Sequence, residues 1–174
     1  MSILNACKIQ ISSLNFGLHE YEFKIDNDFF SSFKDSLIDK GHFQVIAAID
    51  KKVSMLVLDL SISGGMITSC DRCLEKISLP LEGTQQYTFK YKADIEEQDL
   101  DSELIYISDT EQVLDISPWI YETICLAIPI IKTYDCENDP GANCNEEILD
   151  FLYTQEKEQS INPIWDSLKK EIKK

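Results

Sequence analysis

The fold of this chain is decided by residues 43–62, which read FQVIAAIDKKVSMLVLDLSI. Its first part, Phe43 to Ile49, is apolar and rich in residues that favour β-strands. In the second part, Val53 to Ile62, the centre from Met55 to Leu58 is apolar on both faces, which favours a central position in a sheet. Asp50 to Lys52 supplies a polar turn between them. The stretch therefore predicts a β-hairpin whose second strand is central in a sheet.

The residues before this hairpin predict another strand and a helix. Residues 20–25 alternate between charged and apolar side chains, which is the pattern of a half-buried strand. Asp26 to Asp28 then offers an N-cap. The four apolar residues that follow fit one helical face: Phe29, Phe30, Phe33 and Leu37. We expect Gly41 to close this helix.

The residues after the hairpin continue the sheet. Ser63 to Gly65 predicts a bend or a bulge, and Met66 to Thr68 leads into the motif Cys-Asp-Arg-Cys-Leu at residues 70–74. Beyond the motif, apolar side chains alternate with others over residues 77–81 and again over residues 87–91. The pattern predicts an antiparallel β-meander with the cysteine motif at a strand-to-strand connection.

A helix over residues 117–128 is the strongest helical prediction. Ser117 can cap it and Pro118 suits its first position. Four isoleucines repeat at every fourth residue on its apolar face: Ile116, Ile120, Ile124 and Ile128. Cys125 lies off the centre of this stripe, so we interpret it as a packing residue. A short helix is expected at residues 146–153. The fold class predicted is α+β, a single domain in which an antiparallel meander sheet packs with a few helices.

We expect the α+β domain to cover residues 1–153, followed at 154–174 by a polar linker and a C-terminal amphipathic helix. Trp165 lies on the apolar face predicted for that helix. Lys169 and Lys170 belong to a basic cluster that is opposite in charge to the rest of the chain. The helix either docks on its own domain or binds a partner.

The charge of the chain is strongly unbalanced. It carries 31 acidic and 16 basic side chains, for a formal net charge of −15. Such a chain repels nucleic acid phosphates and attracts a basic partner, for which a ribosomal protein is a suitable candidate. Acidic residues are densest from 94 to 115, around a predicted edge strand at 104–107. This stretch is either a solvated loop or a landing surface for a basic partner.

The sequence also indicates a compartment and disfavours enzyme classes. It contains no run of 18 apolar residues and no signal peptide pattern at its start, so we expect a cytoplasmic protein that does not enter a membrane. Its six cysteines should then be reduced. We find no Gly-rich phosphate loop, no nucleophile elbow and no HExxH motif, and we predict that the protein is not an enzyme.

Four of the cysteines suggest a metal site. Cys70 and Cys73 have the spacing of a zinc-ligand pair, whereas Cys136 and Cys144 are more widely spaced around a Pro-Gly turn. Together they could supply four thiolates to a tetrahedral zinc ion. The alternative is that Cys136 is incidental and the first pair is structural. A thioredoxin-type dithiol fits less well, because its CxxC opens a helix, whereas strand-like segments flank this one.

Several of these features together resemble the YceD family of large-subunit ribosomal RNA accumulation proteins, especially its Bacteroidetes-type members. The most specific of them is the motif at residues 70–74. The others are the acidic stretch, the helix that ends in Ile128-Pro129, a downstream cysteine with Asn145, and a terminal helix with Pro163 and Trp165. The resemblance extends over nearly the whole chain.

The resemblance implies a non-enzymatic factor for 23S ribosomal RNA processing or accumulation, and so for the biogenesis of the large ribosomal subunit. Its partner would be a large-subunit ribosomal protein or a pre-ribosomal particle. We assign the candidate partner contacts to Arg72, the lone cation between two thiols, and to Trp165, Lys169 and Lys170 in the tail. The alternative function is a metal-binding or redox-sensing module that uses Cys70 and Cys73.

Overall fold

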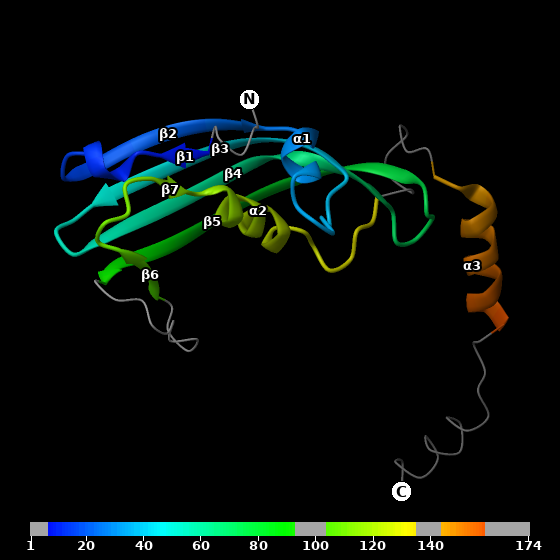
Figure 1. The fold of residues 1–174 in the computed structure, drawn as a ribbon. Helices are drawn as coiled ribbons and strands as arrows, with labels where there is room; N and C mark the ends of the chain where they lie inside the picture. Colours follow the sequence, from blue (N-terminus) through cyan, green and yellow to red (C-terminus); the bar gives the residue numbers. More distant parts are fainter. Residues whose placement is uncertain (1–6, 93–103, 135–143, 159–174) are drawn as a thin grey trace, which may run out of the picture. The chain divides into compact units, whose positions relative to one another are not determined.

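The computed structural model of the protein describes residues 7–92, 104–134 and 144–158. They form an α+β fold, as predicted, with a five-stranded sheet, a two-stranded sheet and three α-helices (Figure 1). The chain divides into two compact units. The first comprises Met1–Thr68 and Ser78–Ile130, and the second comprises Ser69–Ile77 and Ile131–Lys174. The cysteine motif therefore belongs to the second unit.

The five-stranded sheet has the order β2-β3-β4-β5-β6. Its strands are β2 (Gly17–Ile25), β3 (Lys40–Lys51), β4 (Met55–Ser69), β5 (Lys76–Lys92) and β6 (Leu104–Ser108). Both β2 and β4 pair with β3 in the antiparallel direction. The predicted hairpin is thus confirmed, and its second strand, β4, is central in the sheet as expected.

The edge strand β6 departs from the predicted meander, because it runs parallel to β5, with Phe89 opposite Ile105. An antiparallel neighbour can follow a tight turn, whereas a parallel one requires a connection of about a dozen residues. The chain between Lys92 and Leu104 is close to that length. The edge strand itself was predicted correctly, and its parallel direction adds one exception to a sheet that is otherwise mostly antiparallel, as predicted.

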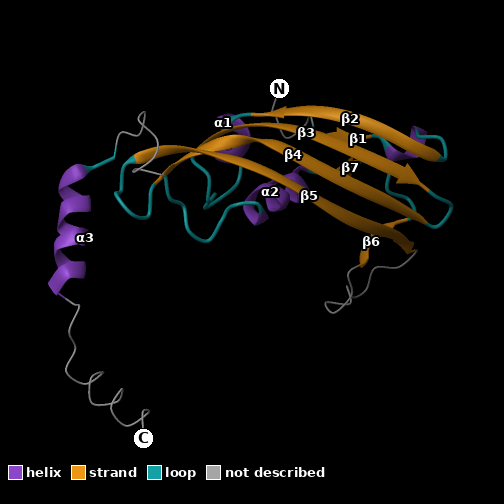
Figure 2. Cartoon of the chain, turned by 180° about the vertical axis from the view of Figure 1, so that it is seen from behind, coloured by secondary structure: helices purple, strands orange, loops and turns teal. Residues whose placement is uncertain are grey.

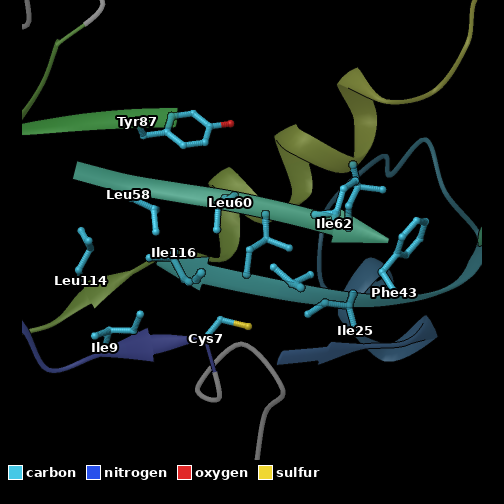
Figure 3. Packing of buried hydrophobic residues seen from close by; sticks show 14 of the residues in the cluster. Cys7, Ile9, Ile25, Phe43, Leu58, Leu60, Ile62, Tyr87, Leu114 and Ile116 are labelled. Carbon is cyan, nitrogen blue, oxygen red and sulfur yellow. The ribbon is translucent and has the colours of Figure 1, made fainter. Parts of the chain in front are cut away.

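One face of the sheet forms the core of the first unit. Side chains alternate along the strands, so that residues such as Val45, Ala47, Leu58 and Leu60 are all buried on the same side. Figure 3 shows this packing at close range. Burial of apolar surface contributes roughly 25 cal/mol per Å², which makes this face the main source of stability in the unit.

Short elements from the first and last parts of the first unit's sequence cover the core face of the sheet. They are β1 (Lys8–Ile9), the 3-10 helix η2 (Ile11–Ser13), α1 (Asn27–Ser31), β7 (Leu114–Asp115) and α2 (Ser117–Leu126). Strands β1 and β7 pair with each other as an antiparallel two-stranded sheet. Helix α2 lies across the sheet in Figure 1. Three isoleucines of the predicted stripe are fully buried, Ile116, Ile120 and Ile124. The fourth, Ile128, is only half-buried, because the helix ends at Leu126 and not at Ile128 as predicted.

Glycines keep the long strands continuous where a bulge was predicted. Strand β4 passes through Gly64 and Gly65 with unbroken register against β3, so the predicted bend or bulge was wrong. A Cβ at Gly64 would collide with the backbone carbonyl of His42 and with Cα of Phe43. The glycine therefore permits two strands to approach closely, and this close approach explains its place inside a strand.

Two helix ends differ from the sequence prediction. Asp26 caps α1 as expected, since its Oδ1 accepts a hydrogen bond from the backbone N–H of Asp28 at 3.2 Å. However, α1 ends at Ser31, and Gly41 lies within β3. The hydroxyls of Ser31 and Ser32 donate to carbonyls of the helix, a local pattern that weakens helix continuation.

The first turn of α2 is held by Asp115 rather than by the predicted Ser117 cap. Oδ1 of Asp115 accepts hydrogen bonds from the backbone N–H of Ser117 at 3.0 Å and from its hydroxyl at 2.6 Å. Pro118 occupies the start of the helix as expected. In the second unit, α3 (Glu146–Glu158) continues beyond Tyr153, where the sequence predicted its end.

Candidate functional site

The Cys70–Leu74 turn joins β4 to β5 and is closed by its own backbone. The N–H of Cys70 donates to the carbonyl of Glu75 at 2.8 Å, and the N–H of Leu74 donates to the carbonyl of Cys70 at 3.0 Å. Leu74 adopts a φ of 62°, in the left-handed region that non-glycine residues seldom occupy. The turn is therefore a defined structure, although it contains no glycine.

Both cysteines of the motif are buried. Cys70 and Cys73 each have 0% relative exposure, and Ile77 completes the buried cluster. Three partly buried side chains pack around it: Tyr134, Cys144 and Leu149. All of these residues belong to the second unit, so the cysteine motif forms the centre of its small core.

The environment of Cys70 stabilises a thiolate. Burial by itself would raise the pKa of this thiol, but backbone N–H groups of Cys73, Arg72 and Tyr134 donate to its sulfur. The thiol of Cys73 adds a further hydrogen bond, and the net effect lowers the pKa of Cys70 below its ordinary value. N–H donors around a buried sulfur are also typical of a thiolate that ligates a metal.

Asp71 connects the turn to a distant segment by hydrogen bonds in both directions. Its backbone N–H donates to the carbonyl of Lys132 at 2.7 Å, and its Oδ2 accepts from the N–H of Lys132 at 2.7 Å. The Lys132 ammonium adds an ion pair with Oδ1 at 3.7 Å. These contacts hold the turn against the irregular segment around Lys132, which begins the C-terminal part of the second unit.

Arg72 makes the third connection from the turn, to helix α3. Its Nη2 donates to the hydroxyl of Tyr153 at 2.7 Å, and its guanidinium lies 5.6 Å from the centre of the same ring. Asn145 begins the helix by accepting a hydrogen bond from the N–H of Ile148 at 3.3 Å. The sequence suggested that Arg72 neutralises the thiolates or contacts a partner, and it did not predict this contact with Tyr153.

Of the four predicted zinc ligands, Cys70 and Cys73 lie in one buried cluster and Cys144 packs against that cluster, whereas Cys136 is outside the described residues. Cys144 is disulfide-bonded in this structure, so the prediction that all six cysteines are reduced was wrong for this residue. In the described ranges, no three side chains of His, Cys, Asp or Glu are placed to hold a metal ion. The predicted contacts Trp165, Lys169 and Lys170 also lie outside those ranges.

Sequence reasoning missed the partners of the turn. Lys132 and Tyr153 are 61 and 81 residues away from the residues that they contact. No spacing rule connects positions so far apart. The sequence places Tyr153 on the predicted helix that follows Asn145, and this position gave little indication that it contacts the turn. Cys125 packs at the edge of the core of the first unit, as interpreted.

The geometry defines a small α+β protein whose CxxC motif is a turn between two sheet strands, with both cysteines buried and Asp71 and Leu74 exposed. The chain belongs to the YceD family: the family model described as large ribosomal RNA subunit accumulation protein YceD matches residues 58–170. This match starts within β4 and includes the whole cysteine motif, as the resemblance predicted.

The chain is also similar to a curated protein. The chain is 30% identical over 127 residues to the uncharacterized protein YlbN of Bacillus subtilis, which covers 71% of this chain and 70% of the relative. No solved structure matches the chain. Of the helices that the structure describes, none combines the length and the hydropathy needed to cross a membrane.

Proposed function

We propose that this protein is a non-enzymatic factor for 23S ribosomal RNA processing and accumulation, and thus for biogenesis of the large ribosomal subunit in the cytoplasm. Membership of the YceD family is the observation that carries the proposal. The partner proposed is a basic component of the large subunit, either a ribosomal protein or a pre-ribosomal particle.

The charge of the chain supports a protein partner over naked RNA. A net charge of −15 opposes the binding of phosphates, whose contacts with proteins depend on lysine and arginine. The same charge favours rapid encounter with a basic protein. Any contact with ribosomal RNA would then be made through that protein, or through the lysines of the tail.

The burial of the cysteine motif supports a non-enzymatic role. A nucleophilic or redox cysteine must be accessible to its substrate, whereas Cys70 and Cys73 are fully covered. We propose that the motif acts as a structural turn that organises the second unit. Arg72 would help to organise it and, with the tail residues Trp165, Lys169 and Lys170, would contact the partner.

Two measurements test this function together. In a strain that lacks the protein, the ratio of 23S to 16S ribosomal RNA should fall and 23S precursors should accumulate. Affinity capture of the tagged protein at moderate salt should enrich large-subunit proteins over a tag-only control. A normal 23S to 16S ratio combined with no enrichment of large-subunit components would refute the proposal.

As a second candidate, we propose that the second unit binds zinc when its cysteines are reduced. The observation that favours it is the packing of Cys144 against Cys70 and Cys73. Backbone N–H groups also donate hydrogen bonds to the sulfur of Cys70. Cys136 would be the fourth ligand. Zinc would join the turn to the beginning of α3 and stabilise the small core.

Metal analysis of protein purified under reducing conditions tests this candidate. Wild-type protein should carry about one zinc ion per chain, and Cys73→Ser should lose it and melt at a lower temperature. Cys125→Ser is the matched control, because Cys125 packs in the first unit. If wild-type protein contains no zinc and Cys73→Ser is as stable as wild type, the site does not exist.

A further inference from the structure

The second face of the five-stranded sheet is open. Along β3 and β4, residues that alternate with the core are exposed or half-buried. Figure 2 views this side of the sheet, with helix α2 behind it. The elements that cover the core face are those from β1 to α2. In the described part of the first unit they do not cover the second face, which is exposed to solvent.

Strand register places three carboxylates around the middle of the open face. Glu20 on β2 lies opposite Ala48 on β3, which lies opposite Asp59 on β4. In the next exposed row, Glu22 lies opposite Ile46. All three carboxylate side chains are on exposed residues, so the face carries negative charge on both sides of a small apolar centre.

The centre of this face is hollowed. Small side chains at Ala48, Ser61 and Thr84 leave a shallow depression of about 290 Å³, which Ile46 and Asp59 also line. Ile46 is 40% exposed, an unusual amount for an isoleucine in the middle of a sheet. Gln86 of β5 donates to Oδ1 of Asp59 at 2.6 Å and fixes that carboxylate beside the hollow.

The carboxylates of this face are not neutralised within the described part of the chain. The ion pairs found there join Lys52 to Asp50 and Lys132 to Asp71, and neither involves Glu20, Glu22 or Asp59. Lysines also occupy exposed positions of the same face, Lys24 on β2, Lys40 on β3 and Lys90 on β5, and none of them forms an ion pair with the three carboxylates in the described ranges. The three unpaired carboxylates at the centre of the face belong to a chain whose net charge is −15, so a cationic ligand is attracted to the chain at long range.

We infer that this open face binds an extended, lysine- and arginine-rich segment of a basic protein. The aliphatic stems of those residues would lie on Ile46 and Ala48, while their charged ends reach Glu20, Glu22 and Asp59. This inference rests on the proposed function and names the surface that receives the ribosomal partner. RNA is a poor occupant, because its phosphates would meet three carboxylates.

A charge-neutral variant tests the surface. Glu20→Gln, Glu22→Gln and Asp59→Asn together keep the shape of the face and remove three charges. The matched control is Asp39→Asn, Glu111→Gln and Glu122→Gln, three exposed carboxylates elsewhere in the first unit, so that both variants have the same net charge. Circular dichroism and melting curves establish that both variants are folded.

Each protein is used to capture large-subunit proteins from a ribosome extract at stepped salt, and the captured proteins are identified by mass spectrometry. The face variant should retain about tenfold less basic ribosomal protein than wild type, because three ion pairs are lost, whereas the control should retain nearly all. Carbodiimide cross-linking of the wild-type complex should join partner lysines to Glu20, Glu22 or Asp59.

The outcomes separate this inference from the function on which it rests. Equal capture by wild type and the face variant, or an equal loss in the control, would overturn the inference and leave the proposed function standing. Capture that disappears after ribonuclease treatment would also overturn it, since the contact would then be with RNA. If wild type captures no large-subunit protein, the proposed function fails and the inference fails with it.

Discussion

At the scale of single residues, Asp71 makes the contacts that hold the cysteine turn most firmly to the rest of the second unit. Replacing it with alanine removes the acceptor for the N–H of Lys132 and the ion pair with its ammonium. Both side chains are partly exposed, so we expect a loss of about 1 kcal/mol in the free energy of unfolding. Urea unfolding measures this loss.

Local opening of the turn gives a second readout of the same change. Alkylation of Cys70 and Cys73, mapped by mass spectrometry, should be faster in Asp71→Ala than in wild type, because both thiols react only when the turn opens. Asp71→Asn keeps an acceptor oxygen and should lie closer to wild type. Unchanged alkylation rates in Asp71→Ala would show that the contact to Lys132 does not hold the turn.

Residue chemistry was predictable where it depends on neighbours in sequence. The spacing of Cys70 and Cys73 was sufficient to predict that the two thiols act together, and they lie in one buried cluster. The roles of Asp71 and Arg72 were not predictable, because each depends on a residue more than 60 positions away. Nothing in the local sequence indicates which distant backbone will approach a turn.

At the scale of the elements, the continuity of β4 depends on Gly64. A methyl group there would overlap the backbone of His42 and Phe43 on β3, and backbone cannot move aside as a side chain does. We expect Gly64→Ala to lower the free energy of unfolding by about 1–3 kcal/mol. Chemical denaturation followed by circular dichroism measures the change.

Ser63→Ala is the control for this substitution, since Ser63 is an exposed neighbour in the same strand. Its effect should stay within about 0.5 kcal/mol of wild type. A Gly64→Ala protein as stable as the Ser63→Ala protein would mean that β3 and β4 can separate locally at no cost, contrary to their unbroken register.

The elements show where sequence patterns succeed. Alternation predicted β2, the hairpin and the buried stripe of α2, because burial on one face dictates the period of apolar residues. It could not predict the direction of β6, since parallel and antiparallel neighbours bury the same alternate residues. Alternation also could not show whether a glycine within a strand forms a bulge or permits close packing. Gly64 does the latter, because β3 approaches it closely.

At the scale of the whole molecule, a buried thiol and a buried tyrosine hydroxyl make the free energy of unfolding depend on pH in the alkaline range. Burial raises the pKa of the Cys7 thiol above its ordinary value of 9.0 and the pKa of the Tyr87 hydroxyl above its ordinary value of 10.0. The unfolded chain therefore loses these protons at a lower pH than the folded protein does. The contribution of these two groups to stability is complete below about pH 9 and is lost as the pH rises from there.

Urea unfolding at pH 7.5, 9.0 and 10.5, in the presence of a reducing agent, measures this dependence. Each buried group contributes a slope of up to about 1.4 kcal/mol per pH unit between its unfolded and its folded pKa. Tyr87→Phe keeps the ring and removes the ionisable hydroxyl, so its stability should decline less steeply above pH 10. A decline as steep as that of wild type would exclude Tyr87 as a source.

The fold class of the whole molecule was predictable from the order of its patterns, strands interrupted by a few amphipathic helices. The division into two units was not. Ser69–Ile77 belongs with Ile131–Lys174, and this grouping arises from contacts of Asp71, Arg72 and the cysteine cluster that no sequence period encodes. The open face is also a property of the assembled sheet, because its three carboxylates come from two separate strands.

The connections from the cysteine turn have a consequence for the newly made chain. Lys132 and Tyr153 are synthesised long after Asp71 and Arg72, so the turn has none of these partners while it leaves the ribosome. The thiols of Cys70 and Cys73 must therefore be exposed to the cell for the time that translation of the intervening residues takes. The second unit can close only after Tyr153 has been synthesised, and every molecule passes through an interval in which these thiols can be oxidised or can meet a metal.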